Sequence, residues 1–218
     1  MIEVTYIDHM GSDISVVNAA RVSFGKKSEW MPRIHYGEQL VLKPKDAKLI
    51  KYLAKHKHKS PFNHTFVTFH VKAPIFVARQ LQKHEYMPWN EISRRYVDDD
   101  PEFYFPLTWR GRSTDKKQGS EGEVKSNFNI NYHTMTALKG YQQMLDEGVA
   151  PEQARMVLPQ SMMTEWYWSG TLFAFAKMCS LRLKSDTQEE TQLVAQKVAL
   201  TMAKIYPVSW DALMEYAE

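Results

Sequence analysis

Apolar and polar residues alternate in several short segments, which is the pattern of half-buried β-strands. Residues 1–8, "MIEVTYID", are rich in β-branched side chains and predict an opening strand. Residues 65–73, "TFVTFHVKA", alternate so regularly that this strand should bury one face. Residues 162–170, "MMTEWYWSG", are strand-like, and residues 102–107, "EFYFPL", favour a short strand.

Helical spacing of apolar residues dominates the rest of the chain. Ser12 or Asp13 is expected to cap the first helix and Ser209 the last, and Pro74 suits the first turn of a helix that should end before Pro88. By residue number, helices are expected at 11–24, 45–58, 74–87, 127–148, 151–159, 171–183, 187–206 and 209–216.

Together these elements predict an α+β fold in a single domain over residues 1–218. A mixed or antiparallel sheet should be flanked by helices, and the C-terminal half should be rich in helix. The polar segments 25–44 and about 107–126 are expected to be loops. The second contains many Gly, Ser and Lys residues and is interpreted as a mobile insertion.

Composition restricts the class of protein. The chain is 44% hydrophobic and 24% charged, as in soluble globular proteins. A net charge of +3 permits an anionic small ligand but is weak support for nucleic-acid binding, and residues 98–100 are all acidic. Cys179 is the single cysteine, so no intramolecular disulfide forms. No signal peptide is expected, and the sequence has no run of about 20 apolar residues that would span a membrane. We therefore expect a cytoplasmic protein.

Polar groups are densest where the helix beginning at Pro74 runs into "YMPWNEISRRY", residues 86–96. Ser and Arg side chains beside free backbone N–H groups suit a phosphate, whereas Gln, Asn and Glu suit the edge of a base or a flavin ring. For any single polar residue on the helix, a solvated face is the simpler interpretation. The loop residues together are more typical of a binding site; they are Asn90, Glu91, Ser93, Arg94 and Arg95.

Outside this loop, several polar residues have two interpretations. Arg155 either reaches the surface or points into a cleft. Arg182 follows an apolar helix and needs an anionic or polar partner, whereas Cys179 is simplest as a small core residue. His58 and His64 lack the cysteines or carboxylates of a metal site, so no metal is expected. The sequence contains no dinucleotide-binding glycine motif, P-loop or nucleophile elbow.

Residues 83–95 resemble the signature of the flavin-dependent thymidylate synthases, R-H-R-x-x-S-x-N-x-x-S-x-R. Four of its seven defined positions match outright, a lysine keeps the charge of the first arginine, and a glutamate and a proline replace the second arginine and the first serine. The similarity extends to "ARQ", "ARMVLP", "LRLKSDTQEE" and residues 11–24. The seven positions hold Lys83, His84, Glu85, Pro88, Asn90, Ser93 and Arg95.

The resemblance implies methylation of dUMP to dTMP. Methylene-tetrahydrofolate would supply the carbon, reduced FAD the hydride and NADPH the electrons for FAD, and no side chain would act as a covalent nucleophile. It also implies a homotetramer with active sites between subunits. No nucleic-acid or membrane partner is expected.

The resemblance also implies roles for individual residues. Arg182 should face the uracil edge, favour ionisation at N3 and so activate C5. The residues that should bind dUMP are Gln80, Lys83, Glu91, Ser93, Arg94, Arg95, Arg155 and Arg182. Those that should contact FAD are His58, Ser60, Asn63, Lys83, His84, Glu85, Asn90 and Lys177.

Departures from the family pattern lie on the flavin side. Glu85 replaces an arginine, Asn63 stands where a glutamate is common, and Thr171 and Phe173 replace an asparagine and an arginine. We therefore expect dUMP binding to be retained and FAD or folate to be held differently. Two alternatives follow: a flavin- and folate-dependent enzyme with another product, such as a hydroxymethylated pyrimidine, or a dUMP-binding homologue without turnover. DNA binding is the weakest alternative.

Overall fold

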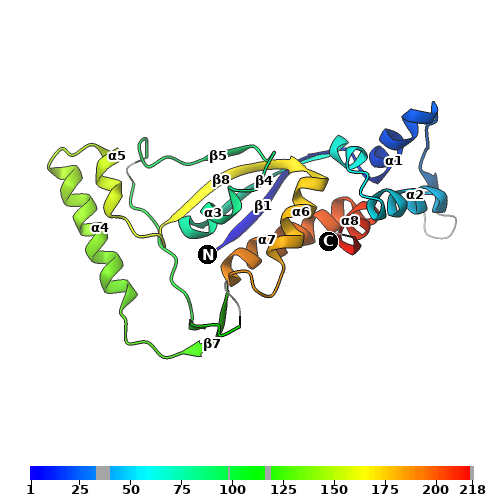
Figure 1. The fold of residues 1–218 in the computed structure, drawn as a ribbon. Coiled ribbons are helices and arrows are strands. Elements are labelled where there is room, and N and C mark those ends of the chain that lie inside the picture. The colour runs from blue at the N-terminus through cyan, green and yellow to red at the C-terminus, as the bar shows by residue number, and fades with distance from the viewer. Residues whose placement is uncertain (33–39, 98, 116–118, 217–218) are drawn as a thin grey trace.

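The centre of the molecule is an antiparallel sheet in the strand order β1-β4-β8-β5 (Figure 1). A computed structural model describes residues 1–32, 40–97, 99–115 and 119–216. The α+β class and the antiparallel sheet are as predicted from the sequence. The four strands are β1 (Glu3–Met10), β4 (Phe66–Pro74), β8 (Met163–Thr171) and β5 (Trp89–Glu91).

The alternation in β4 buries one face of the sheet, as predicted. Val67, Phe69 and Val71 have no exposed surface, and across the ladder Phe69 faces Trp168. The other face carries polar side chains, where Thr68 and Ser169 share a hydrogen bond of 2.9 Å. A sheet with one polar face needs helices on the opposite face only.

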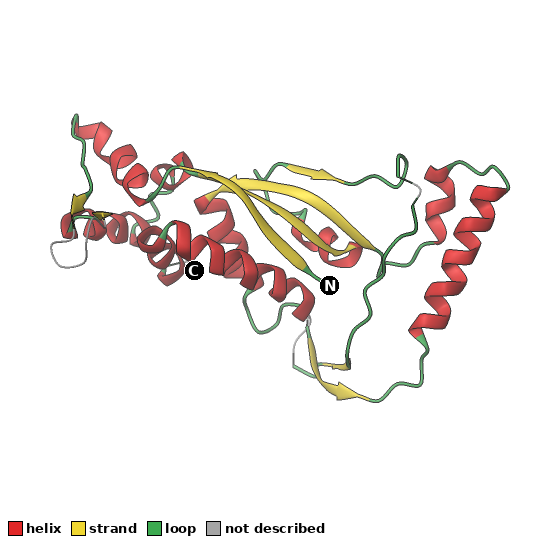
Figure 2. Ribbon diagram, turned by 180° about the vertical axis from the view of Figure 1, so that it is seen from behind, coloured by secondary structure: helices red, strands yellow, loops and turns green. Residues whose placement is uncertain are grey.

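Helices α3, α6 and α7 pack against this sheet, while α1, α2 and α8 gather beyond one of its ends (Figure 1). Helices α4 and α5 stand apart at the opposite end of the molecule, as the view from behind shows (Figure 2). The α-helices are α1 (Asp13–Arg21), α2 (Pro44–Lys55), α3 (Ile75–Leu81), α4 (Ile130–Asp146), α5 (Pro151–Ala154), α6 (Leu172–Arg182), α7 (Glu189–Ile205) and α8 (Pro207–Glu215). The 3₁₀ helices are η1 (Val22–Phe24), η2 (Ser60–His64) and η3 (Arg155–Val157).

Two predictions about helix ends were wrong. Helix α3 ends at Leu81 rather than just before Pro88, and Tyr86 then takes a positive φ of 58° in the connection to β5. Helix α8 begins at Pro207, so Ser209 is not its cap. The carboxylate of Asp13 instead accepts from the backbone N–H groups of Val208 and Ser209, at 3.0 and 2.9 Å.

Two predicted loops contain short strands. Between residues 107 and 126 an antiparallel hairpin forms from β6 (Trp109–Arg112) and β7 (Ser120–Val124), and residues 116–118 of that predicted loop lie outside the described residues. In the predicted loop 25–44, β2 (Met31–Pro32) pairs with β3 (Leu40–Val41), and residues 33–39 lie outside the described residues. The strand expected over 102–107 is reduced to one bridge between Phe103 and Met162.

Candidate functional site

Strand β5 holds the polar loop against the core through a tryptophan. The ring of Trp89 stacks on Trp166 at 4.3 Å and meets Trp168 edge-on at 5.9 Å. Its indole nitrogen donates to Glu91 at 3.0 Å, and the hydroxyl of Thr164 donates to the other carboxylate oxygen at 2.6 Å. Glu91 is therefore fixed before any ligand arrives.

Beside Glu91 lies a cavity of about 860 Å³, here called the arginine cleft. Its charged lining consists of four arginines and two glutamates, so cations are in excess. That balance suits a phosphate, which arginine binds through paired hydrogen bonds. The lining includes Arg79, Glu91, Ser93, Arg94, Arg95, Glu152 and Arg155.

The arginines of the cleft are held to different degrees. Arg94 donates to the backbone carbonyl of Asp99 at 2.6 Å and to its carboxylate at 2.9 Å, so it shapes the loop. The neighbouring Asp98, part of the acidic run 98–100, lies outside the described residues. Arg95 and Arg155 are exposed, and Arg155 makes a bond of 3.3 Å to the carbonyl of Glu152. These two side chains can turn toward an anion.

A second hollow, the lysine cleft, consists of two cavities of about 290 and 210 Å³ that both reach Lys177. Phe62 and Phe173 contribute apolar walls to the larger cavity, and the Lys59 ammonium lies 5.5 Å from the centre of the Phe173 ring. Such a lining suits an aromatic anion. The sequence-predicted residues that line the two cavities are His58, Lys83, His84, Glu85 and Lys177.

Two departures from the family pattern contact each other beside this cleft. The Thr171 hydroxyl donates to the side-chain carbonyl of Asn63 at 2.8 Å and accepts from the backbone N–H of Ala174 at 3.1 Å. Thr171 therefore caps α6 while it binds η2. Ser60 is an exposed residue of η2. The two substitutions form one interaction, which links the elements on either side of the lysine cleft.

Arg182, at the C-terminal end of α6, is fixed by two acceptors. Its Nε donates to His84 Nε2 at 3.1 Å, and its terminal nitrogen donates to the backbone carbonyl of Gln80 at 3.0 Å. Burial, together with the charges of Arg182 and Lys177, lowers the pKa of His84 to about 4. The imidazole is thus neutral at pH 7 and can accept from Arg182.

One chain does not bring all the predicted residues together. Gln80, Lys83 and Arg182 do not line the arginine cleft, and Asn90 is exposed on β5 and lines neither cleft. The sequence prediction gave no binding role to several lining residues, among them Arg79 and Lys59. Arg79 lies one helical turn before Lys83, which could have indicated it, whereas nothing in the local sequence pointed to Lys59.

Cys179 is fully buried, and its thiol donates to the carbonyl of Ala195 at 3.6 Å. Burial raises the pKa of this thiol, so it is a core residue rather than a nucleophile, as predicted. The described part of the chain contains no group of three or more His, Cys, Asp or Glu residues that could bind a metal. Within the same residues, no helix is long and apolar enough to cross a membrane.

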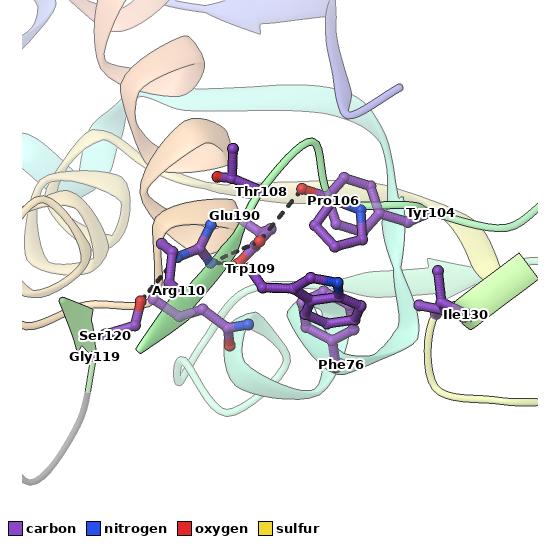
Figure 3. A pocket seen from close by; sticks show the side chains of 12 residues that line it. Phe76, Tyr104, Pro106, Thr108, Trp109, Arg110, Gly119, Ser120, Ile130 and Glu190 are labelled. Atoms are coloured by element: carbon purple, nitrogen blue, oxygen red, sulfur yellow. Dashed lines mark hydrogen bonds and ion pairs between the residues drawn. The ribbon is translucent and has the colours of Figure 1, made fainter. Parts of the chain in front are cut away.

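A third cavity, of about 500 Å³, lies between the β6–β7 hairpin and the start of α7 (Figure 3). Phe76, Tyr104 and Trp109 contribute aromatic walls. Its charged groups are Arg110 and Glu190, which bind each other at 2.7 Å. Because these charges are mutually satisfied, this cavity is a poorer anion site than the arginine cleft.

Known proteins resemble this chain over most of its length. The sequence model of the family described as "Thymidylate synthase complementing protein" (Thy1) matches residues 5–208. The flavin-dependent thymidylate synthase of Thermus thermophilus is 38% identical over 98% of this chain and 76% of its own length. The enzyme of the same name from Thermotoga neapolitana is 36% identical over 98% of this chain and 91% of its own.

A solved structure also resembles this chain over its whole length. The UMP/dUMP methylase PolB from Streptomyces cacaoi, bound with 5-Br dUMP, superposes with a TM-score of 0.82 at 31% identity, over all of this chain and 96% of its own. The family predicted from residues 83–95 is confirmed over nearly the whole chain. On the match to residues 5–208 and the 36–38% identity to these relatives, the chain belongs to the flavin-dependent thymidylate synthase family of enzymes.

Proposed function

We propose that this protein methylates dUMP to dTMP, with methylene-tetrahydrofolate as carbon donor, reduced FAD as hydride donor and NADPH as the reductant of FAD. The observation that carries the proposal is the arginine cleft. Ser93, Arg95 and Arg155 surround a cavity of a nucleotide's size, beside a Glu91 already fixed by two hydrogen bonds.

The chain's own residues bind and polarise the nucleotide in this proposal. Arg95 and Arg155 bind the phosphate, and Glu91 and Ser93 orient the sugar and base. Arg182 stabilises negative charge at the uracil edge, because a fixed guanidinium in a partly dry site supports an anion better than water does. Carbon C5 loses its proton and gains a methyl group built from one folate carbon and one hydride.

The lysine cleft fits a flavin cofactor by its chemistry. Phe62 and Phe173 provide apolar surface for a ring system, and Lys59 and Lys177 provide cations for a pyrophosphate. When bound, FAD supplies the hydride. The larger cavity, about 290 Å³, is at the lower end of the roughly 300–1,000 Å³ usual for ligand sites. One chain is therefore proposed to supply part of the cofactor site.

A homotetramer with active sites between subunits accounts for the missing parts. Arg182 lies outside the arginine cleft of its own chain, so a second copy would bring it to the nucleotide. Helix α4 extends away from the sheet, and its main contacts are with α5 and η3 (Figure 1). Phe128 beside this helix and Tyr132 and Met135 on it are exposed, as expected of a surface that a partner covers. We propose that the assembly works in the cytoplasm.

Purified protein tests the proposal directly. Visible flavin absorption, with or without added FAD, and dTMP formation from dUMP, methylene-tetrahydrofolate and NADPH are expected. Arg182→Ala should abolish dTMP formation while FAD still binds. A protein that takes up no flavin and forms no dTMP would overturn the proposal.

A second candidate substrate is UMP. It is suggested by the PolB structure, whose description names both UMP and dUMP as substrates and which is also solved with 5-Br UMP. Competition between UMP and dUMP in the same assay separates the two. Efficient methylation of UMP would broaden the function, whereas dTMP formation unaffected by excess UMP would remove this candidate.

A further inference from the structure

Hydrogen bonds on either side of the first turn of α7 link Arg182 to the β6–β7 hairpin. We propose that Glu190, Gln188 and Gln80 transmit the position of this hairpin to Arg182, and that Gln188 and Glu190 are positioning residues for the reaction. The inference rests on the proposed function, because Arg182 has a substrate only if a uracil nucleotide is bound.

The series begins at Arg110 on β6 (Figure 3). Its terminal nitrogen donates to both carboxylate oxygens of Glu190 at 2.7 Å, a second terminal nitrogen lies 2.8 Å from Glu189, and its Nε donates to Ser120 of β7 at 2.8 Å. Glu190 is only 3% exposed, and Tyr104 donates to it at 3.3 Å. The hairpin and the first turn of α7 are thus held together by a nearly buried ion pair.

Gln188, the residue just before α7, connects the start of this helix to α3. Its side-chain oxygen accepts from Gln80 Nε2 at 2.6 Å. Glu190 lies two residues later, in the first turn of α7, so a shift of Glu190 with that turn would reach Gln80 through Gln188.

Gln80 completes the connection. Thr191, which is fully buried on α7, donates to the Gln80 side-chain oxygen at 3.1 Å, so both ends of this amide are fixed by α7 and the residue before it. The backbone carbonyl of Gln80 accepts from Arg182, whose Nε also bonds His84. The position of α3 against α7 consequently decides where the Arg182 guanidinium points.

Neither Glu190 nor any described residue of the hairpin lines the arginine cleft. Loss of the connection should therefore leave nucleotide binding nearly intact and reduce the rate, since a displaced catalytic group lowers turnover more than affinity. A residue that only stabilises the fold would instead lower the melting temperature and leave the turnover of folded protein unchanged.

The test uses Gln188→Ala in the full-length protein. We expect kcat for dTMP formation to fall about 10- to 100-fold, with dUMP affinity by calorimetry within about twofold of the parent. The NMR titration of His84 should also move to higher pH, because a released Arg182 no longer opposes its protonation. The other charges near His84 are Lys83 and Glu85 on its own segment and Lys177 on α6, and they are unchanged. Arg112→Ala, an exposed arginine on β6, is the matched control.

Glu190→Gln provides a second variant that keeps the shape of the side chain. If one path connects both residues to Arg182, the loss of kcat in the double variant should be smaller than the product of the single losses. Additive losses, or single variants with parental kcat and parental His84 titration, would overturn the inference while dTMP formation by the parent still stood. If the parent formed no dTMP, the proposed function would fail, and the His84 titration would still decide whether Arg182 is held.

Discussion

The arginine cleft and the lysine cleft differ in how many of their polar side chains are held in place by hydrogen bonds within one chain. In the arginine cleft, Glu91 has both oxygens bonded and Arg94 is tied to Asp99. In the lysine cleft, the side chains of Lys83, Glu85 and Lys177 are exposed, and Glu85 replaces an arginine of the family pattern. A preset site loses less entropy when it binds than a site whose long side chains must first be ordered. The comparison indicates that one chain fixes more of the arginine cleft than of the lysine cleft.

The largest expected effect is a loss of dUMP affinity, without a loss of FAD affinity, when an arginine of the arginine cleft is removed. Arg155→Ala should weaken dUMP binding about 10- to 150-fold, because a charge-assisted hydrogen bond contributes about 1.5–3 kcal/mol. FAD binding should not change. Calorimetric titration of both ligands measures this, with Arg112→Ala as the control. Equal weakening of FAD and dUMP would contradict the separation.

The next effect concerns the tryptophan that holds the arginine cleft. Trp89→Ala should lower the free energy of unfolding by about 2–3 kcal/mol, because it removes a stacked, half-buried ring. It should also weaken dUMP binding more than FAD binding, since Glu91 loses a donor. Trp89→Phe keeps the ring contact and loses only the indole bond, so it should recover most of the stability but not the affinity. Recovery of both by phenylalanine would exclude a role for that bond.

A smaller effect addresses the lysine cleft. Glu85→Arg restores the family's charge and should tighten FAD binding about 2- to 5-fold at low salt, within the range of exposed charge pairs. dUMP affinity should remain unchanged. Glu123→Arg on β7 makes the same change in net charge at an exposed position away from both clefts. Equal tightening in the two variants would mean that overall charge, rather than the cleft, is responsible.

The last effect is a pH dependence of stability that comes from His84. Its pKa is about 4 in the folded protein and 6.5 ordinarily, so between these values the unfolded chain binds a proton that the folded chain does not. Stability should therefore fall as the pH decreases from 6.5 to 4. Urea unfolding of His84→Gln should show a shallower fall, and exposed His64→Gln should match the parent. Parallel curves for all three proteins would rule out His84 as the source.

Elements with a strong local pattern could be predicted from the sequence. The alternation around Val67, Phe69 and Val71 is a property of neighbouring residues, and it located β4 and its buried face. The hydrogen bonds that define the candidate site connect distant residues. Gln80 and Gln188 are 108 positions apart, as are Asn63 and Thr171, so no local period indicates either pair.

The cap of α8 shows the same limit. Ser209 has the right type and position for a cap, but Asp13, 195 residues before Val208, supplies the acceptor. Local propensity favoured the serine, and tertiary packing put a carboxylate at the helix start instead. Likewise, residues 107–126 have the composition of a loop, and the ion pair of Arg110 with a glutamate 80 positions later binds the hairpin to α7. Composition alone therefore did not predict the two strands β6 and β7.

Mass spectrometry of the nucleotide product tests the central claim most directly. The protein is incubated with dUMP, NADPH, FAD and methylene-tetrahydrofolate that carries two deuterium atoms on the transferred carbon. We predict dTMP whose methyl group retains both deuterium atoms and has gained one hydrogen. A product heavier by an oxygen atom would identify a hydroxymethylated pyrimidine, and unchanged dUMP in flavin-loaded protein would identify a nucleotide-binding homologue; either result would contradict the account.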